Sequence, residues 1–196
     1  MIHFYKPNPK VTGTACSFWL NRDGSIMGSM IKQDSWNEVK KIGSFSKNKD
    51  NPQARVIIKF SKIEIAGIVD ALEREVEFKT YHTSQNQILQ VLFRLYLDKV
   101  TGEKKGFSFS INKQQKDDST AKTGFIIGFN YPEARLLRHE LLRILTEALY
   151  ADDAAKDQSN RDEKSAPREE QAPARPQQQQ AAPQKPTAQS GEEDLW

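Results

Sequence analysis

Hydrophobic and polar residues alternate along two stretches near the start of the chain. Residues 14–33 ("TACSFWLNRDGSIMGSMIKQ") and 54–60 ("ARVIIKF") show the period of two that places every second side chain of a strand on one buried face. The segment from Asn21 to Gly24 interrupts the first stretch with residues that tolerate positive φ. The pattern predicts two strands joined by a tight turn, then a polar loop over 34–53, then a third strand.

The hydrophobic period changes to that of a helix after residue 60. From Ser61 onward ("SKIEIAGIVDALERE") the apolar positions recur three or four residues apart, at Ile65, Val69, Leu72 and Val76. Ser61 and Glu64 have the spacing of a capping box, in which each side chain binds a free backbone amide at the helix start. The sequence therefore predicts a helix that begins directly after Ser61.

The second half of the chain repeats this arrangement. Four segments have the pattern of strands, namely "EFKTYHT", "NQILQVLFRLYL", "KGFSFSINKQ" and "KTGFIIGFN". A helix over 132–150 follows them, with Asn130 and Glu133 at the spacing of a second capping box. Each half thus predicts several strands followed by one helix.

Two pairs of short segments match between the halves. "VIIKFSKIE" (56–64) corresponds to "FIIGFNYPE" (125–133), and "SMIKQ" (29–33) corresponds to "SINKQ" (110–114). Any two amphipathic strand and helix pairs look somewhat alike, but here the caps, the Lys-Gln pair and the order of elements match as well. We predict an α+β fold built from a duplicated unit of antiparallel strands followed by a helix.

Large apolar residues become rare after Tyr150. Between residues 151 and 196 only Leu195 and Trp196 are large and apolar, among Gln, Pro, Ala and charged residues. Such a segment cannot bury enough apolar surface to offset the entropy lost on ordering its backbone. We predict a folded domain over 1–150, a disordered linker over 151–191 and an acidic tip over 192–196.

Charge divides at the same boundary. Residues 151–196 contain six basic and ten acidic side chains, a net charge of −4, whereas the whole chain carries +3. The first 150 residues therefore carry a net +7. A basic domain with an acidic tail favours a polyanion as ligand, with ordinary solubilising charge as the alternative.

Residue types needed for metal or redox chemistry are sparse. Cys16 is the only cysteine, and the three histidines are far apart in the sequence, so we predict neither a metal site nor a cofactor. No apolar run reaches the roughly 20 residues of a membrane span, and the first ten residues lack the apolar core of a signal peptide. We expect an intracellular protein, cytoplasmic or nucleoid-associated, that binds no membrane.

The order of the predicted elements resembles a known architecture. Two successive copies of strands followed by a helix, on a basic domain of this size, are similar to the Whirly proteins over about Phe4 to Tyr150. Whirly proteins are the duplicated relatives of the PC4-like single-stranded DNA-binding fold. The resemblance implies that the strands form a nucleic-acid surface and that the helices pack behind them. The Lys-Gly-Lys-Ala-Ala-Leu run of plant Whirly proteins is missing here, so no residue role is transferred.

The tail carries a second, independent resemblance. A basic nucleic-acid domain, a Gln/Pro-rich linker and an acidic tip ending in apolar residues are similar to bacterial and phage single-stranded DNA-binding proteins. In those families the tip recruits replication and repair partners. The matching positions are Glu192, Glu193, Asp194, Leu195 and Trp196, although Leu-Trp replaces the usual Pro-Phe ending. The resemblance implies that a terminal aromatic fills a partner's pocket while the acids steer the approach.

Aromatic and basic residues outside the predicted core are the candidates for nucleic-acid binding, because bases stack on aromatic rings and phosphates bind cations. "GFSFSIN" also looks aromatic, but Phe107, Phe109 and Ile111 alternate as a core set. On the strands, the candidates are side chains that we expect to point away from the core, namely Trp19, Lys32, Arg55, Lys59, Tyr81, Arg94, Tyr96, Lys113 and Lys122. The loop over 34–53 adds Trp36, Lys40, Lys41 and Phe45.

These features predict a single-stranded DNA-binding protein that coats exposed strands and recruits replication or repair partners through its tip. The alternatives are a PC4-like transcription regulator or an RNA-binding chaperone. A nuclease is disfavoured, because Asp117 and Asp118 lie in a polar turn without a partner histidine nearby in the sequence. Sheet edges left uncovered by two half-barrels also favour a homo-oligomer.

Overall fold

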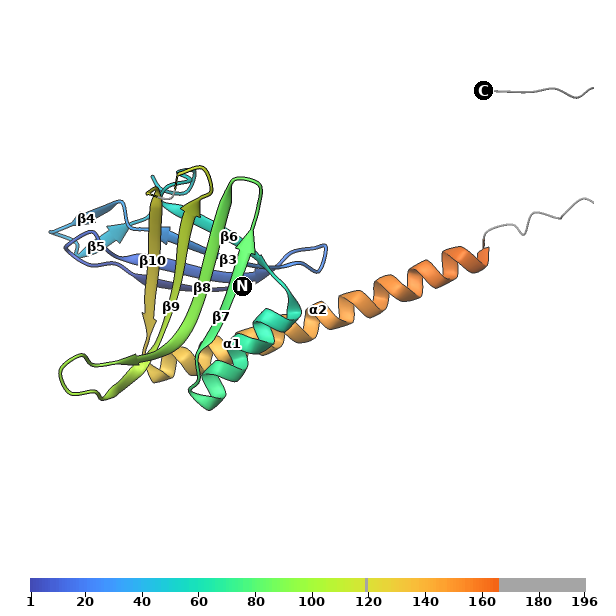
Figure 1. Ribbon diagram of the computed structural model, residues 1–196. Helices are drawn as coiled ribbons and strands as arrows, with labels where there is room; N and C mark the ends of the chain where they lie inside the picture. Colours follow the sequence, from blue (N-terminus) through green and yellow to red (C-terminus); the bar gives the residue numbers. More distant parts are fainter. Residues whose placement is uncertain (119, 166–196) are drawn as a thin grey trace, which may run out of the picture.

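The computed structural model describes residues 1–118 and 120–165, which form two four-stranded antiparallel sheets and two helices. The sheets lie one behind the other with their strands running in clearly different directions, and both helices lie at one end (Figure 1). The first sheet has the order β1-β2-β3-β6, and the second has the order β10-β9-β8-β7. This arrangement confirms the predicted α+β fold.

The first unit comprises seven elements before the chain enters the second. They are β1 (Ile2–Lys6), β2 (Thr14–Leu20), β3 (Ile26–Lys32), β4 (Ser35–Asn37), β5 (Ile42–Ser44), β6 (Arg55–Phe60) and α1 (Lys62–Arg74). Strands β4 and β5 pair only with each other and form a hairpin between β3 and β6. This hairpin falls within the predicted polar loop, because its three-residue strands are too short to show a period.

The second unit contains the same sheet and helix without the hairpin. Its elements are β7 (Phe78–Thr83), β8 (Gln87–Leu97), β9 (Lys104–Gln115), β10 (Lys122–Phe129) and α2 (Tyr131–Ser165). Strand β10 pairs with β9 as β6 pairs with β3. The two units therefore have the same strand order once the hairpin is set aside.

The strand register confirms the duplication residue by residue. Met30 pairs with Val56 across β3 and β6. Ile111, the matching residue of "SINKQ", pairs with Phe125 across β9 and β10. The two pairs of matching segments were identified independently of each other. In both sheets, the strands that contain them pair in the same register.

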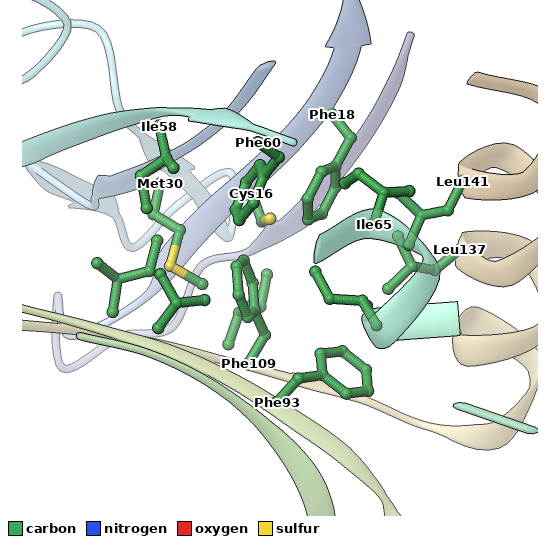
Figure 2. Packing of buried hydrophobic residues seen from close by; sticks show 14 of the residues in the cluster. Cys16, Phe18, Met30, Ile58, Phe60, Ile65, Phe93, Phe109, Leu137 and Leu141 are labelled. Atoms are coloured by element: carbon green, nitrogen blue, oxygen red, sulfur yellow. The ribbon is translucent and has the colours of Figure 1, made fainter. Parts of the chain in front are cut away.

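The hydrophobic core lies between the two sheets and is closed at one end by the helices (Figure 2). Phe18 of the first sheet packs against Phe109 of the second, with ring centroids 5.7 Å apart. Ile65 of α1 and Leu137 of α2 are fully buried against the same cluster. Each such side chain contributes about 1.5 to 3 kcal/mol by leaving water, so the two units fold around one shared core.

Both predicted helix caps are present. Ser61 and Glu64 form a capping box at α1, and the Glu64 amide donates to Ser61 Oγ at 3.2 Å. Asn130 and Glu133 exchange the equivalent bonds at α2, with distances of 2.9 and 3.0 Å. These bonds satisfy amides that the first helical turn leaves free.

The structure adds one strand to the prediction and corrects the ends of both helices. Strand β1 was absent from the sequence-based expectation, because "IHFYK" is too short to stand out. Helix α1 ends at Arg74, where Glu75 adopts a left-handed conformation with φ of 58°, so Val76 lies outside it and is exposed. Helix α2 continues past Tyr150 to Ser165, because the segment contains the helix formers Ala, Lys, Gln, Arg and Glu and no proline before Pro167.

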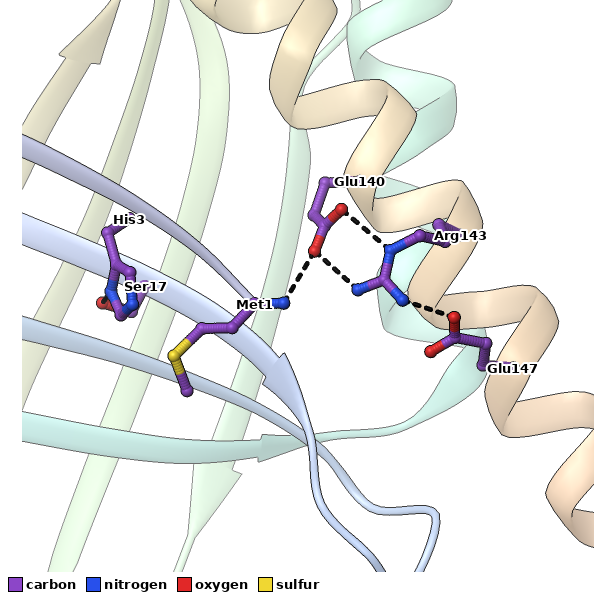
Figure 3. Close-up of polar contacts among 6 residues, drawn as sticks. All are labelled: Met1, His3, Ser17, Glu140, Arg143 and Glu147. Carbon is purple, nitrogen blue, oxygen red and sulfur yellow. Dashed lines mark hydrogen bonds and ion pairs between the residues drawn. The ribbon is translucent and has the colours of Figure 1, made fainter.

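Ion pairs fasten helix α2 to the first unit. The amino group of Met1 lies 3.0 Å from Glu140 Oε1, and Glu140 also accepts from Arg143, which reaches on to Glu147 (Figure 3). Donation by Arg143 and Met1 lowers the pKa of Glu140 to about 2. Lys62 of α1 pairs with Asp152, which lies beyond the predicted end of the helix. These contacts help to position the helices at the end of the sandwich, away from the outer sides of the sheets.

Candidate nucleic-acid interface

Each sheet has a side that points away from the shared core. On the first sheet this side, here called the first outer face, is formed by His3, Tyr5, Ala15, Ser17, Trp19, Met27, Ser29, Ile31, Arg55, Ile57 and Lys59. On the second sheet, the second outer face is formed by Lys79, Tyr81, Gln90, Leu92, Arg94, Tyr96, Ser108, Ser110, Asn112, Lys122 and Ile126. Strand alternation places these residues on the side opposite the core, although the small side chains of Ala15, Ser29 and Ser108 are also buried.

Tyrosine occupies the same position on both outer faces. Tyr5 lies in a cross-strand row that ends at Arg55 after passing Ala15 and Ile31. The row of Tyr81 passes Gln90 and Asn112, and Asn112 is the counterpart of Ile31 in the matched segments. Each tyrosine therefore lies on the first strand of its sheet, in the same register, with 60% and 56% of its surface exposed.

A side chain that carries nitrogen lies beside the ring of each tyrosine. The imidazole of His3 stacks on Tyr5, with centroids 6.0 Å apart and planes 29° apart. Lys79 Nζ lies 5.2 Å from the centroid of the Tyr81 ring. The hydrogen bond with Tyr81 raises the pKa of Lys79 further above neutral pH, where lysine is ordinarily charged. An exposed ring beside a cation can take a base on its face and a phosphate at its edge.

Seven of the predicted strand residues lie on the outer faces. These are Trp19, Arg55, Lys59, Tyr81, Arg94, Tyr96 and Lys122. Trp19 is half-buried, and its Nε1 donates to Asn21 Oδ1 at 2.8 Å. Arg55 is also half-buried and donates to the Lys49 carbonyl at 2.7 Å. The predicted direction of these side chains is right, and their role in binding stays a prediction.

Lys32 and Lys113 are on the other side of their sheets, which corrects the predicted outward placement. Each lies two residues beyond a buried one, Met30 or Ile111, and therefore shares the inner face. Lys32 Nζ lies 5.3 Å from the centroid of the Phe125 ring, and Lys113 Nζ donates to the Pro52 carbonyl at 2.9 Å. Long side chains can occupy such places because the stem packs on apolar surface while the amine reaches polar partners.

The β4–β5 hairpin forms a groove with β1. Phe45 follows β5, and its ring centroid is 5.8 Å from that of Tyr5. The two rings contribute to an open groove of about 480 Å³, with Lys41 and Lys49 also in its lining. Trp36 and Lys40 belong to the same hairpin but lie outside this lining. Of the four predicted loop residues, Phe45 and Lys41 thus lie in one groove with Tyr5 of β1.

Gln33 and Asp34 hold the hairpin beside β1. Gln33 is buried and bonds to three segments: its Oε1 accepts from the amides of Asn8 and Gly13, and its Nε2 donates to the carbonyls of Asn8 and Ser35. A Cβ at Gly43 would lie 2.7 Å from Gln33 Nε2, so this close approach requires glycine. Asp34 accepts from the Ser35 hydroxyl and the Lys47 amide, which lowers its pKa.

Sequence reasoning missed His3, Tyr5 and Gln33. The signal for Tyr5 was the short alternation in "IHFYK", whose Phe4 is buried and whose neighbours are exposed. For Gln33 the signal was the Lys-Gln pair shared by the two matched segments, which was used only as evidence of duplication. The predicted partner-binding residues, Glu192, Glu193, Asp194, Leu195 and Trp196, lie outside the described residues.

Within residues 1–118 and 120–165, no three His, Cys, Asp or Glu side chains cluster in a way that could hold a metal ion. Burial raises the pKa of the Cys16 thiol, which keeps it neutral. None of the helices in this part of the chain is long and apolar enough to cross a membrane. What the outer faces offer is ring surface and positive charge.

Comparison with known proteins finds similarity in structure alone. No known protein family matches the sequence, and no curated protein matches it either. WHY1 from Arabidopsis thaliana is similar over 81% of this chain and 90% of its own, with a TM-score of 0.54 and 13% identity. WHY3 from the same plant covers 79% and 91% respectively, with a TM-score of 0.52 and 13% identity.

A third solved structure, described as the plant transcriptional regulator PBF-2, covers 80% of this chain and 85% of its own. Its TM-score is 0.52 and its identity is 13%. All three likenesses span most of both chains, so they concern the whole two-sheet arrangement rather than one element. The duplicated sheet-and-helix architecture of this chain is therefore Whirly-like.

Proposed function

We propose that this protein binds single-stranded DNA on the outer faces of its two sheets, with little preference for sequence. The observation that carries the proposal is the recurrence of an exposed tyrosine, Tyr5 and Tyr81, in the same register of both sheets. Burial in the core explains the apolar residues that the two units share, but it does not explain a shared ring that is more than half exposed. A surface on which bases stack explains why both units carry this exposed ring.

Positive charge supports the same ligand. Lys59, Arg94 and Lys122 are exposed on the outer faces, and residues 1–150 carry a net charge of +7. Phosphates attract such cations over the length of a strand, while ring stacking adds about 1 to 3 kcal/mol for each base. Duplex DNA hides the faces of its bases, so a ring-bearing surface favours unpaired strands.

Fluorescence anisotropy with dT20, a 20-mer RNA and a 20-bp duplex tests this function. We expect the tightest binding to single-stranded DNA, and a log K that falls with log salt by about 0.7 for each phosphate neutralised. Equal affinity for the duplex, or a binding constant that does not respond to salt, would contradict the proposal.

We further propose that the tip over 192–196 recruits a replication or repair partner. The support is its acidic, apolar-ended sequence, which can place one aromatic anchor in a pocket while the linker keeps it near the bound strand. Deletion of Leu195 and Trp196 should abolish capture of that partner from a cell extract and leave DNA binding intact. Retention of the same partners by the truncated protein would reject the recruiting role.

A second candidate function is transcription regulation. One structural neighbour is described as a transcriptional regulator, and its likeness spans the whole two-sheet arrangement. This function would require preference for particular sequences, whereas a coating protein tolerates all of them. Selection of bound strands from a random single-stranded library separates the two, because a coating protein enriches no motif.

Self-association is also part of the proposal, because the edge strands β1 and β6 of the first sheet and β7 and β10 of the second leave backbone groups available for pairing. We expect a homo-oligomer. Light scattering coupled to size-exclusion chromatography measures the mass directly, and a monomer at micromolar concentration would reject this expectation.

A further inference from the structure

The β4–β5 hairpin is an insertion that the second unit lacks, and it builds a site beside Tyr5. We propose that the groove between β1 and this hairpin binds one unpaired nucleobase together with its flanking phosphates. The inference rests on the proposed single-strand function and deepens it: one strong anchor per chain, on the first unit, supplements the weaker stacking positions on the two outer faces.

The two rings in the groove are placed to contact a base from different sides. Tyr5 is 60% exposed, and Phe45 is half-buried. Their centroids are 5.8 Å apart and their planes meet at 59°, so a base cannot lie flat on both. It can stack on Tyr5 while its edge packs against Phe45, which is a favourable arrangement for aromatic pairs. Pro7 and Ile42 add apolar lining to the same groove.

Positive charge lines the groove where phosphates would lie. Lys41 and Lys49 are both exposed in its lining. Among the described residues Lys49 forms no ion pair, and Lys41 pairs only with Glu38 at 2.8 Å. Both side chains of this pair are exposed, so the ion pair is weak. A phosphate can therefore replace the Glu38 carboxylate. A nucleotide matches this groove, because its phosphates can bind the two cations and its base can contact the two rings. An apolar peptide or a lipid chain would leave the cations without a partner.

The groove is held in shape before any ligand arrives. Gln33 joins the hairpin to the segment after β1 through four hydrogen bonds between 2.8 and 3.2 Å. Asp34 binds the Ser44 hydroxyl and the Lys47 amide on the far side of the hairpin. A preformed site binds more tightly, because less motion is lost when the ligand is ordered.

The second unit offers no such site beside Tyr81. The connection from β9 to β10 covers only residues 116–121, and its sequence contains no aromatic residue. Within the described part of the chain, Tyr81 has Lys79 as its neighbour, and no aromatic ring pairs with it. The insertion therefore makes one of two equivalent tyrosines part of a two-ring groove.

Photo-cross-linking of the full-length protein tests the groove directly. The probe is dT10 carrying one 5-iodouracil, which couples to an aromatic side chain that it contacts on irradiation. We expect the major cross-linked peptides to contain Tyr5 or Phe45. Cross-links confined to Tyr81, Trp19 or Tyr96 would overturn the groove assignment, and this result needs no variant.

Affinity measurements supply a second readout with a matched control. Phe45→Ala should weaken dT10 binding about tenfold, and Lys49→Gln should weaken it about threefold. Val39→Ala is the control, because Val39 belongs to the same hairpin, is 93% exposed and lies outside the groove. It should change affinity less than twofold. Thermal melting checks that Phe45→Ala is folded, and Phe45→Leu replaces it if it is not.

The outcomes separate the groove from the general function. If wild-type protein binds dT10 and both Phe45 and Lys49 variants bind it equally well, the groove assignment fails while single-strand binding stands. If wild-type protein binds no single strand at all, both fail. Cross-links in the groove combined with the tenfold loss at Phe45 support the proposal.

Discussion

The two outer faces began as copies of one surface and now differ in character. The first outer face carries Trp19, Met27 and Ile31, whereas the second carries Arg94, Ser108 and Asn112 at the corresponding positions. The inner faces, by contrast, carry the apolar core cluster in both units, with Lys32 and Lys113 at the ends of the matched segments. Close packing between the sheets restricts every inner substitution, while outer residues are free to change unless a ligand constrains them.

Tyr5 and Tyr81 form an aromatic pair among the corresponding residues of the two outer faces, where Ser29 matches Ser110 and Ile57 matches Ile126 as well. The hairpin adds Phe45 beside Tyr5 and leaves Tyr81 without a second ring. Duplication supplied two equivalent exposed tyrosines, and one insertion made their surroundings unequal. Each prediction below tests either what the two faces share or what separates them.

The largest effect should come from breaking what the two faces share. Phe109 packs on Phe18 across the sheets and is 2% exposed, so Phe109→Ala should cost about 3 to 5 kcal/mol and remove both outer faces together. Trp19→Ala, on the first outer face, should cost far less. Urea unfolding followed by circular dichroism measures both. Equal destabilisation by the two variants would mean that the assigned faces are reversed.

The next largest effect should come from loosening the hairpin alone. Gln33→Ala removes a buried side chain that satisfies the amides of Asn8 and Gly13, and each group left unpaired costs about 1 to 3 kcal/mol. We expect faster amide exchange in the hairpin and weaker dT20 binding, with the second sheet unchanged. Hydrogen exchange read by mass spectrometry resolves the two regions. Uniform loosening of both sheets would show that Gln33 supports the whole core instead.

The two tyrosines should differ when each is removed. Tyr5→Ala should cost about 2 kcal/mol of binding free energy for dT20 and Tyr81→Ala about 1 kcal/mol, since only Tyr5 has a second ring beside it. Anisotropy titrations at one fixed salt concentration measure the difference. Losses of the same size would indicate that the hairpin contributes nothing to binding. Neither variant should change the melting temperature greatly, because both rings are exposed.

The smallest effect should appear on acidification. Hydrogen bonds from Ser35, Lys47 and Ser44 lower the pKa of Asp34 in the folded protein. A lowered folded-state pKa stabilises the protein above the ordinary pKa of aspartate, and that contribution is lost as the pH falls through the lowered value. The Lys47 amide signal in an NMR titration should therefore move only well into the acid range. Asp34→Asn should abolish that movement, and a midpoint at the ordinary value would contradict it.

Local pattern was enough to predict most of the fold. Period-two segments around Phe18, Ile58, Phe93 and Phe109 predicted strands and their buried sides, because alternation follows from strand geometry alone. Both caps were predicted because a capping box needs only four neighbouring residues. Strand β1 and the hairpin were missed, since three to five residues carry too little period to distinguish a strand from a loop.

What the sequence by itself determined was therefore local: the strand and helix types, the buried sides, the caps and the repeat of one unit. The tertiary structure alone decided which outer residues meet. Tyr5 and Phe45 are 40 positions apart, and their rings meet where Gln33 bonds both to Asn8, after β1, and to Ser35, at the start of the hairpin. Lys32 approaches the Phe125 ring and Lys113 donates to the Pro52 carbonyl, and each contact joins segments far apart in the sequence. Periodicity places a side chain on one side of its own strand. Its contacts depend on how segments far apart in the sequence pack together, and no local pattern contains the distance between such segments.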